Sequence, residues 1–427
     1  ALTSVALVER AIEAYGRHGE TTNAFITFTP DAAMADARAC DDARRHGRWR
    51  GPLHGIPISI KDLVDVEGTP TTAGSRVLSA TPAAQDATVV ARLRQAGAVI
   101  LGKTNLHEFA FGTTGEDSAF GPVRHPRDLD RMAGGSSSGS AAAVASGIGL
   151  ASVGTDTGGS IRIPAALCGL VGLKPSYGDV PVDGVVPLCA SFDHVGPITV
   201  SVDDAALMWS VMSAAGDVTL PSLDAGALRL GVPSEYFLDL LEDDARVAWD
   251  AAVGILRARG ATIQAVSIPR ASSTPDAYLP IVFRESWAWH REFIERSPER
   301  YTTAVRTRLE MGRGVGPEDY ARALALRESL TREVDAALAG VDALALPAMA
   351  VTAPRLGTTE IRFGERTEPV RAVMLRLTQL FDITGHPAMT MPIAAAPSLP
   401  CGFQLVGPRT ETAKLLALAK AVEAVVS

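Results

Sequence analysis

The segment DATVVARLRQAGAVILGKTN, residues 86–105, contains the pattern that decides the fold class. Its first half places the apolar residues Val89, Val90 and Leu93 at helical spacing among polar neighbours. Gly97 is a helix-stop signal, and the apolar run that follows it is typical of a buried strand. A helix that leads directly into a buried strand is the repeating unit of α/β folds. We therefore predict an α/β protein.

The same unit recurs along the chain. The segment DDARVAWDAAVGILRARGATIQAVSIP, residues 243–269, predicts a helix that ends at Gly260 and a strand after it. Strands are also predicted in GIPISIKD, residues 55–62, and after residue 341. Between about residues 269 and 340, long helical patterns predict a variable, cap-like helical region. No Ser/Pro/Gly-rich linker bounds this helical region in the sequence. We therefore expect a single large domain spanning residues 1–427.

Composition and charge exclude several classes of function. The chain has 427 residues, a formal net charge of -8 and no long basic run, so we expect no nucleic-acid partner and no attachment to an anionic membrane surface. An amphipathic helix capped by Thr3 or Ser4 opens the chain, without the apolar core of a signal peptide. The four cysteines are far apart and form no CxxC pair, which predicts no zinc site, no disulfide framework and a cytoplasmic location.

Two glycine–serine segments are candidates for chemistry. The first, MAGGSSSGSAAAVASG, residues 132–147, admits three simpler interpretations: a linker, a phosphate loop or close helix packing. A core-like run follows it, which argues against a linker, and it lacks the lysine of a phosphate loop. Close packing accounts for the alanines and glycines that follow the loop, but not for polar serines beside two glycines. These serines therefore call for a chemical explanation.

The second segment, VGTDTGGSIRIPAALCG, residues 153–169, places Ser160 behind two glycines, where main-chain N–H groups can converge on an oxyanion. A serine nucleophile needs a base. His54 and His194 are interpreted as structural hydrogen-bonders, and no G-x-S-x-G elbow surrounds Ser160. Lys61 directly follows an apolar strand-like run, and lysine is a known alternative base. A surface lysine at a strand end is the simpler interpretation of Lys61 taken alone.

These segments together resemble the amidase signature family of serine hydrolases. The resemblance extends over nearly the whole chain, and its motifs are GIPISIKD, GKTNLHEFAFGTTGEDSAFGP, GGSSSGSAAAVA, GTDTGGSIRIPAALCGLVGLKPSYG, SFDHVGPIT, DITGHPAMTMP and LPCGFQLVG. It implies a central, mixed, twisted β-sheet covered by helices on both faces. It also implies no metal ion and no organic cofactor.

The resemblance assigns roles to individual residues. Ser160 is implied to be the nucleophile, Ser136 a second serine preceded by a cis peptide bond, and Lys61 the base. The expected relay moves a proton from Ser160 to Ser136 and from Ser136 to neutral Lys61, whose pKa burial must lower. Oxyanion donors are expected from Thr157, Gly158, Gly159 and the N–H of Ser160. The resemblance further implies support from four residues: Ser137, Thr155, Asp156 and Arg162.

The predicted function is hydrolysis of small neutral amides, aliphatic or aryl and possibly carbamates, through an acyl-enzyme. A carbamate or ester hydrolase of the same mechanism and a glutaminase-type A subunit of a tRNA amidotransferase are alternatives, and a catalytically inactive binding module is a third. The segment RAVMLRLTQLFDITG, residues 371–385, is apolar and basic where such A subunits present a substrate-binding carboxylate. We expect a small-molecule substrate, drawn into a pocket built from residues 109–117 and 269–367, and a monomer or homodimer.

Overall fold

A computed structural model describes residues 2–216, 218–394 and 399–427, so the predicted domain of residues 1–427 includes residues 1, 217 and 395–398, which lie outside the described residues. The single domain is built on one mixed sheet of eleven strands. In spatial order the strands are β1 (Phe25–Phe28), β3 (Val99–Thr104), β2 (Pro57–Lys61), β6 (Ala151–Asp156), β8 (His194–Thr199), β7 (Val171–Lys174), β14 (Ala388–Met391), β15 (Phe403–Val406), β11 (Ala343–Pro347), β9 (Arg229–Pro233) and β10 (Thr262–Val266). The α/β class predicted from residues 86–105 is confirmed.

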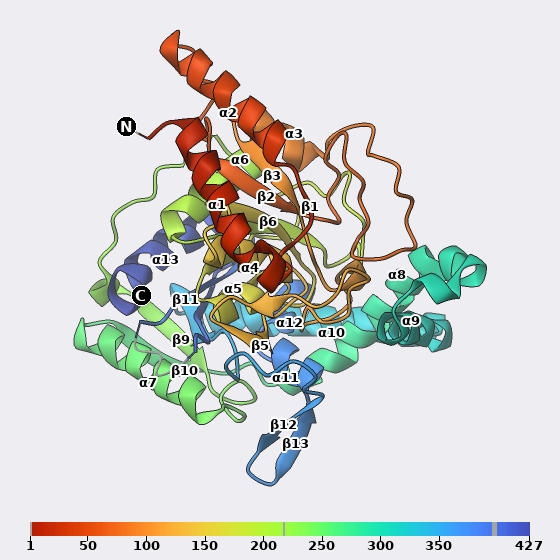
Figure 1. Ribbon diagram of the computed structural model, residues 1–427. Helices are drawn as coiled ribbons and strands as arrows, with labels where there is room; N and C mark the ends of the chain where they lie inside the picture. The colour runs from red at the N-terminus through yellow and green to blue at the C-terminus, as the bar shows by residue number, and fades with distance from the viewer. Residues whose placement is uncertain (1, 217, 395–398) are drawn as a thin grey trace.

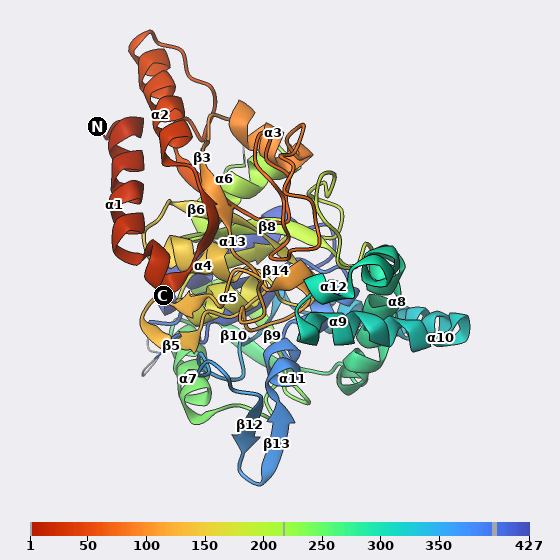
Figure 2. The same cartoon turned by 45° about the vertical axis from the view of Figure 1, so that its right-hand side comes forward.

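The sheet is parallel in some places and antiparallel in others. Strand β2 runs parallel to both of its neighbours, β3 and β6, whereas β6 pairs antiparallel with β8. On the other side, β9 lies between β10 and β11 and is parallel to both. Two short hairpins lie outside the sheet, β4 (Arg124–His125) with β5 (Asp128–Met132), and β12 (Glu360–Phe363) with β13 (Arg366–Pro369). Figures 1 and 2 show the second hairpin projecting from the body.

Helices cover both faces of the sheet, as expected. They are α1 (Ser4–Thr22), α2 (Pro30–Arg45), α3 (Thr88–Gln95), α4 (Ser138–Ala145), α5 (Arg162–Cys168), α6 (Val202–Ser213), α7 (Asp243–Ala258), α8 (Thr274–Arg296), α9 (Thr303–Glu310), α10 (Pro317–Leu338), α11 (Val370–Leu375), α12 (Gln379–Ile383) and α13 (Thr412–Val426). Successive side chains of a strand point to opposite faces. Accordingly, Val99 and Leu101 of β3 join one hydrophobic core with α1 and α4, whereas Ile100 joins the other core.

Local signals in the sequence explain several boundaries. Thr3 caps α1 by accepting a hydrogen bond from the N–H of Ala6 at 3.1 Å. Gly97 and Gly260 follow α3 and α7 with φ of +93° and +106°, a conformation that favours glycine. The helical region predicted between residues 269 and 340 is present as α8, α9 and α10, which Figures 1 and 2 place together at one side of the molecule.

The cysteines behave as the spacing predicts, because Cys40, Cys168, Cys189 and Cys401 are all buried and free. Within the described ranges, no helix has both the length and the apolar character needed to cross a lipid bilayer.

Candidate active site

The candidate site lies where two neighbouring strands end. Lys61 is the last residue of β2, and Thr155 and Asp156 are the last residues of β6. Because β2 and β6 are parallel, their carboxyl ends meet at one edge of the sheet, which is where open α/β sheets place functional groups. Ser136 lies in the loop that precedes α4 and Ser160 in the loop that precedes α5. The three residues predicted to form the relay are therefore brought to one place by three separate segments.

Lys61 is fully buried, and among the described residues its amine hydrogen-bonds only to hydroxyl groups. Its Nζ lies 2.8 Å from Ser136 Oγ and 2.8 Å from Thr155 Oγ1. Burial lowers the pKa of Lys61 to about 7, although the carboxylates of Asp156 and Asp193 act in the opposite direction. A neutral amine has one lone pair, so the Lys61 side chain can accept a proton from a hydroxyl group near neutral pH. The surface-lysine interpretation does not apply, because the side chain has no solvent exposure.

Ser136 and Ser160 lie in loops that Ser137 ties together. The peptide bond between Gly135 and Ser136 is cis, as the resemblance implies. The N–H of Ser137 donates to the carbonyl of Ser160 at 3.1 Å, and its hydroxyl donates to the carbonyl of Thr155 at 3.1 Å. Among the described residues no hydrogen bond joins the hydroxyl groups of Ser136 and Ser160. Of the expected relay, the Lys61–Ser136 hydrogen bond is thus formed, and the one between Ser136 and Ser160 is not.

The loop before α5 presents main-chain donors, with one difference from the prediction. The N–H of Gly159 donates to Asp156 Oδ1, whereas the N–H groups of Thr157, Gly158 and Ser160 make no hydrogen bond within the described chain. Gly159 has φ of +133°, and a Cβ atom there would lie 2.2 Å from Thr378 Oγ1. The glycine is therefore required by its conformation and by the close approach of Thr378. Its N–H is already engaged, which leaves the other three donors for an oxyanion.

Asp156 and Arg162 form a buried pair beneath this loop. Arg162 Nε lies 3.0 Å from Asp156 Oδ2, and neither side chain is exposed to solvent. Burial by itself would raise the pKa of Asp156, but the charge and hydrogen bonds of Arg162 outweigh it and hold that pKa well below its usual range. Asp156 also accepts hydrogen bonds from the N–H groups of Ile161 and Arg162. The alternative of a solvated surface pair is excluded, and the pair fixes the loop that holds Ser160.

Comparison with known proteins identifies the family. The family model described as Amidase matches residues 6–416. The chain belongs to the amidase signature family. A solved structure described as an amidase is 40% identical, covers 100% of this chain and 97% of its own, and superposes with a TM-score of 0.95. The A subunit of the glutamyl-tRNA(Gln) amidotransferase from Chloroflexus aggregans is 37% identical over 99% of this chain and 93% of its own length.

A second solved structure is also of an amidotransferase A subunit. The A subunit of the glutamyl-tRNA(Gln) amidotransferase from Thermotoga maritima is 31% identical, covers 99% of this chain and 94% of its own, and has a TM-score of 0.83. Membership of the amidase signature family makes the chain a hydrolase of carbon–nitrogen amide bonds. The curated relatives support the alternative prediction, the amidotransferase component, better than they support the predicted small-amide hydrolase.

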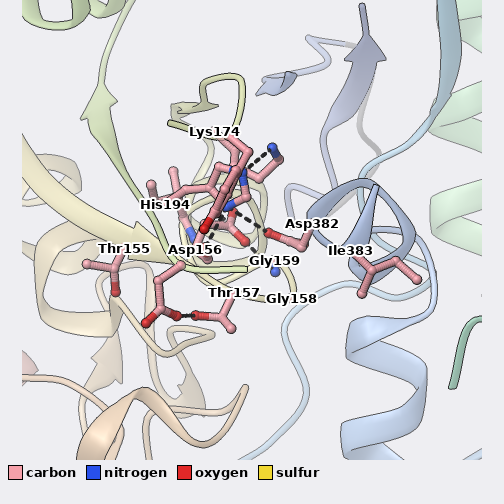
Figure 3. Close-up of polar contacts among 12 residues, drawn as sticks. Thr155, Asp156, Thr157, Gly158, Gly159, Lys174, His194, Asp382 and Ile383 are labelled. Carbon is pink, nitrogen blue, oxygen red and sulfur yellow. Dashed lines mark hydrogen bonds and ion pairs between the residues drawn. The ribbon is translucent and has the colours of Figure 1, made fainter. Parts of the chain in front are cut away.

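Sequence reasoning missed a second buried cluster of this amidase fold, which Figure 3 shows beside the Thr157–Gly159 loop. Asp382 of α12 accepts a hydrogen bond from Arg162, and Lys174 Nζ lies 3.2 Å from His194 Nε2. Burial holds the pKa of Asp382 well above its usual range and that of His194 well below. His194 is thus a structural hydrogen-bonder, as predicted. The signal that could have found the cluster is the set of charged residues inside apolar motifs, in GLKPSYG and DITGHP.

A small cavity of about 10 Å³ opens at Ser160, and a larger one of about 770 Å³ shares Arg371 and Leu375 with its lining. Phe111 and Tyr278 line the small cavity and come from the two regions that the sequence predicts. Arg371 and Leu375 of α11 also line it, although they lie beyond the predicted limit at residue 367. The Ser160 hydroxyl is therefore surrounded by apolar side chains, by three further residues that carry hydroxyl groups and by one arginine.

Proposed function

We propose that this amidase hydrolyses its substrate through an acyl-enzyme on Ser160, with Ser136 and Lys61 as the proton relay. The observation that carries the proposal is the fully buried Lys61 amine, 2.8 Å from the Ser136 hydroxyl and surrounded by hydroxyl groups. A lysine that is neutral near pH 7 can act as a base without help from histidine. Ser160 lines the cavity, and three N–H groups of its own loop make no hydrogen bond within the described residues.

In the proposed reaction, Ser160 Oγ attacks the substrate carbonyl carbon and its proton passes to Ser136, whose own proton passes to Lys61. The developing oxyanion accepts hydrogen bonds from the N–H groups of Thr157, Gly158 and Ser160, each typically worth about 100- to 1000-fold in rate. Collapse breaks the C–N bond, and Ser136 delivers a proton to the departing amine. Water then attacks the acyl-enzyme by the same relay. We expect the hydrogen bond between the Ser136 and Ser160 hydroxyl groups to form when substrate binds, because catalytic hydrogen bonds often tighten only in the complex.

Two alternatives for the enzyme that carries out this reaction, an amidotransferase subunit and a free-standing amidase, are supported by different observations. The curated relatives favour a glutaminase-type A subunit of a tRNA amidotransferase, which is the better supported of the two by sequence comparison. The lining of the Ser160 cavity favours small amides, since it holds Leu375 and no acidic side chain among the described residues. A free-standing enzyme would act on aliphatic or aryl amides, and on esters or carbamates through a similar tetrahedral intermediate. The buried free cysteines support the proposed cytoplasmic location.

One assay series tests the reaction and separates the settings. The purified chain is given aliphatic amides, anilides, aryl carbamates and glutamine, in parallel with Ser160→Ala, and amine or ammonia release is measured. We expect release from small amides by wild type and none by Ser160→Ala. Turnover retained by Ser160→Ala would contradict the proposed mechanism. Glutamine hydrolysis that appears only with partner proteins and charged tRNA would instead assign the chain to the amidotransferase setting.

A further inference from the structure

Arg371 occupies a position that the proposed relay does not use. It lies in α11 and lines both the small cavity at Ser160 and the larger cavity of about 770 Å³. Of the described residues that line the small cavity, Arg371 alone carries a charge. Arg371 therefore borders both the space at Ser160 and the larger cavity.

The guanidinium of Arg371 has no counter-ion in the described part of the chain. Its Nε atom is shielded from solvent and has no hydrogen-bond partner, although the residue as a whole is half-buried. No carboxylate of residues 2–216, 218–394 or 399–427 forms an ion pair with it, and its one ring contact is with Phe111, at 5.7 Å from the centroid. Burial lowers the pKa of Arg371, and the nearby charge of Arg308 lowers it further.

The other arginines near the site are already paired. Arg162 contacts the carboxylates of Asp156 and Asp382. Arg308 donates to the carbonyl of Phe111 at 2.8 Å and lies 3.7 Å from Asp117. A shielded charge without a partner is costly, and proteins normally supply a hydrogen-bonded counter-charge. Arg371 is therefore the arginine near Ser160 for which the described part of the chain supplies no counter-charge.

We propose that Arg371 binds a carboxylate of the substrate, so that the natural substrate is a carboxamide that also bears a carboxylate group. The proposal rests on the acyl-enzyme function proposed above. A guanidinium matches a carboxylate through two parallel N–H···O bonds, and this match is strongest away from water. The described lining of the small cavity at Ser160 offers no acidic side chain to an ammonium group, whereas Glu235, Asp239 and Glu368 line the larger cavity. An amide of a dicarboxylic acid therefore fits better than glutamine, which carries both charges.

The kinetic test uses three amides of one chain length: pentanamide, which is neutral, glutaramate, which adds a carboxylate, and glutamine, which adds an ammonium group to glutaramate. Wild type is expected to prefer glutaramate to both of the others. The ratio of kcat/KM for glutaramate to that for pentanamide is expected to fall on the order of 100-fold in Arg371→Met. Arg371→Lys keeps the positive charge but not the two parallel N–H donors of the guanidinium. Its substrate ratio should lie between those of wild type and Arg371→Met. Malonamate, succinamate and adipamate extend the series to other chain lengths.

A second arm places the carboxylate on the leaving amine, by comparing N-butyrylglycine with N-butyrylethylamine. The arm that shows the larger dependence on Arg371 identifies the side of the amide that carries the carboxylate. Arg327→Met is the matched control, because the half-buried Arg327 donates to the carbonyl of Ile383 and lines neither the Ser160 cavity nor the larger cavity. Its substrate ratios should match those of wild type. Ratios unchanged by Arg371→Met in both arms would overturn the proposal.

Two measurements do not depend on turnover. Titration of succinate, glutarate and adipate into Ser160→Ala should show binding of at least one diacid that the added Arg371→Met change weakens; equal affinities, or no binding of any diacid, would overturn the proposal. Arg371→Met should also leave the unfolding midpoint unchanged or raise it, since it removes an unpaired shielded charge. A marked loss of stability would assign Arg371 a structural role instead. If Ser160→Ala retained wild-type turnover, the proposed function would fail separately from these binding results.

Discussion

Two buried lysines, the last residues of strands β2 and β7, have the same pKa and different surroundings. Burial lowers the pKa of both Lys61 and Lys174 to about 7. Lys61 contacts two hydroxyl groups, whereas Lys174 contacts the carbonyl of Pro175 and the imidazole of His194. Hydroxyl groups can pass protons to and from an amine, whereas a carbonyl can only accept a hydrogen bond. The other ring nitrogen of His194 lies 3.2 Å from the carbonyl of Asp156, so the imidazole does not connect Lys174 to a hydroxyl group of the relay. The comparison shows that burial makes an amine neutral near pH 7, and that its partners decide whether it can serve as a catalytic base.

The largest expected effect separates the two lysines by rate. Lys61→Met should lower kcat/KM at pH 8 on the order of 10⁴-fold, because it removes the base of the relay. Lys174→Met is the matched control and should lower kcat/KM by about tenfold or less, since Lys174 contacts no residue of the relay. Both are measured by amine release from the best amide of the panel. Equal losses in the two variants would show that the base is wrongly assigned.

The second prediction compares the relay with the buried cluster around Arg162 by the free energy of unfolding of their variants. Arg162→Met leaves Asp156 and Asp382 buried without their cation, so the free energy of unfolding should fall by about 3–5 kcal/mol. Urea denaturation followed by circular dichroism measures it. Ser160→Ala, which removes a hydroxyl without a hydrogen-bond partner in the described chain, should unfold at nearly the same urea concentration as wild type. A stable Arg162→Met variant would mean that the cluster does not hold the loop.

The pH dependence follows from the same contrast. Protonated Lys61 cannot accept a proton, so kcat/KM should fall about tenfold for each pH unit below about 7 and level off above it. Initial rates from pH 5.5 to 9 measure the profile. Lys174→Met should keep this acid limb, because Lys174 titrates in the same range without taking part in the relay. If kcat/KM instead kept rising up to about pH 10, where free lysine titrates, a depressed pKa of Lys61 would be contradicted.

The smallest expected effect concerns the loop that carries the oxyanion donors. Thr378→Val removes the hydrogen bond of 2.6 Å from the Thr378 hydroxyl to the carbonyl of Gly158. A bond of this kind is worth about 1 kcal/mol, so kcat should fall about fivefold with little change in KM. The control is Thr307→Val, which removes an exposed hydroxyl within α9. A change confined to KM would show that Thr378 acts on substrate binding and does not position the loop.

Much of the site was predictable because its residues lie in short motifs next to recognisable elements. Lys61 follows an apolar strand, and Ser160 follows two glycines after another. Ser137 and Thr155, from which the resemblance implies support of the site, are joined by a hydrogen bond of 3.3 Å from the Thr155 N–H to Ser137 Oγ. Gly159 was harder to predict, because its N–H is engaged by a side chain three residues earlier. Which donors of a glycine loop are free depends on where that carboxylate points.

The parts that escaped prediction come from the far end of the chain. Asp382 reaches Arg162 across 220 residues of sequence, and Gln404 reaches it across 242. Arg371 reaches the cavity at Ser160 from a helix more than 200 residues away along the chain. In the sequence alone, Arg371 is one basic residue in an amphipathic stretch, and nothing there shows that its Nε atom is shielded from water or that the described chain supplies no counter-ion.

By itself, the sequence determined the α/β class, the strand that ends in Lys61 and the two glycine–serine loops, because periodicity, turn residues and compact motifs act over a few residues. Only the tertiary structure decided which charges are paired, since solvation and ion pairing depend on groups that are distant along the chain. It placed Lys61 among hydroxyl groups, Lys174 beside an imidazole, and Arg371 with no counter-ion among the described residues. Those environments, more than the residue types, separate the proposed base and the proposed carboxylate site from the buried scaffold.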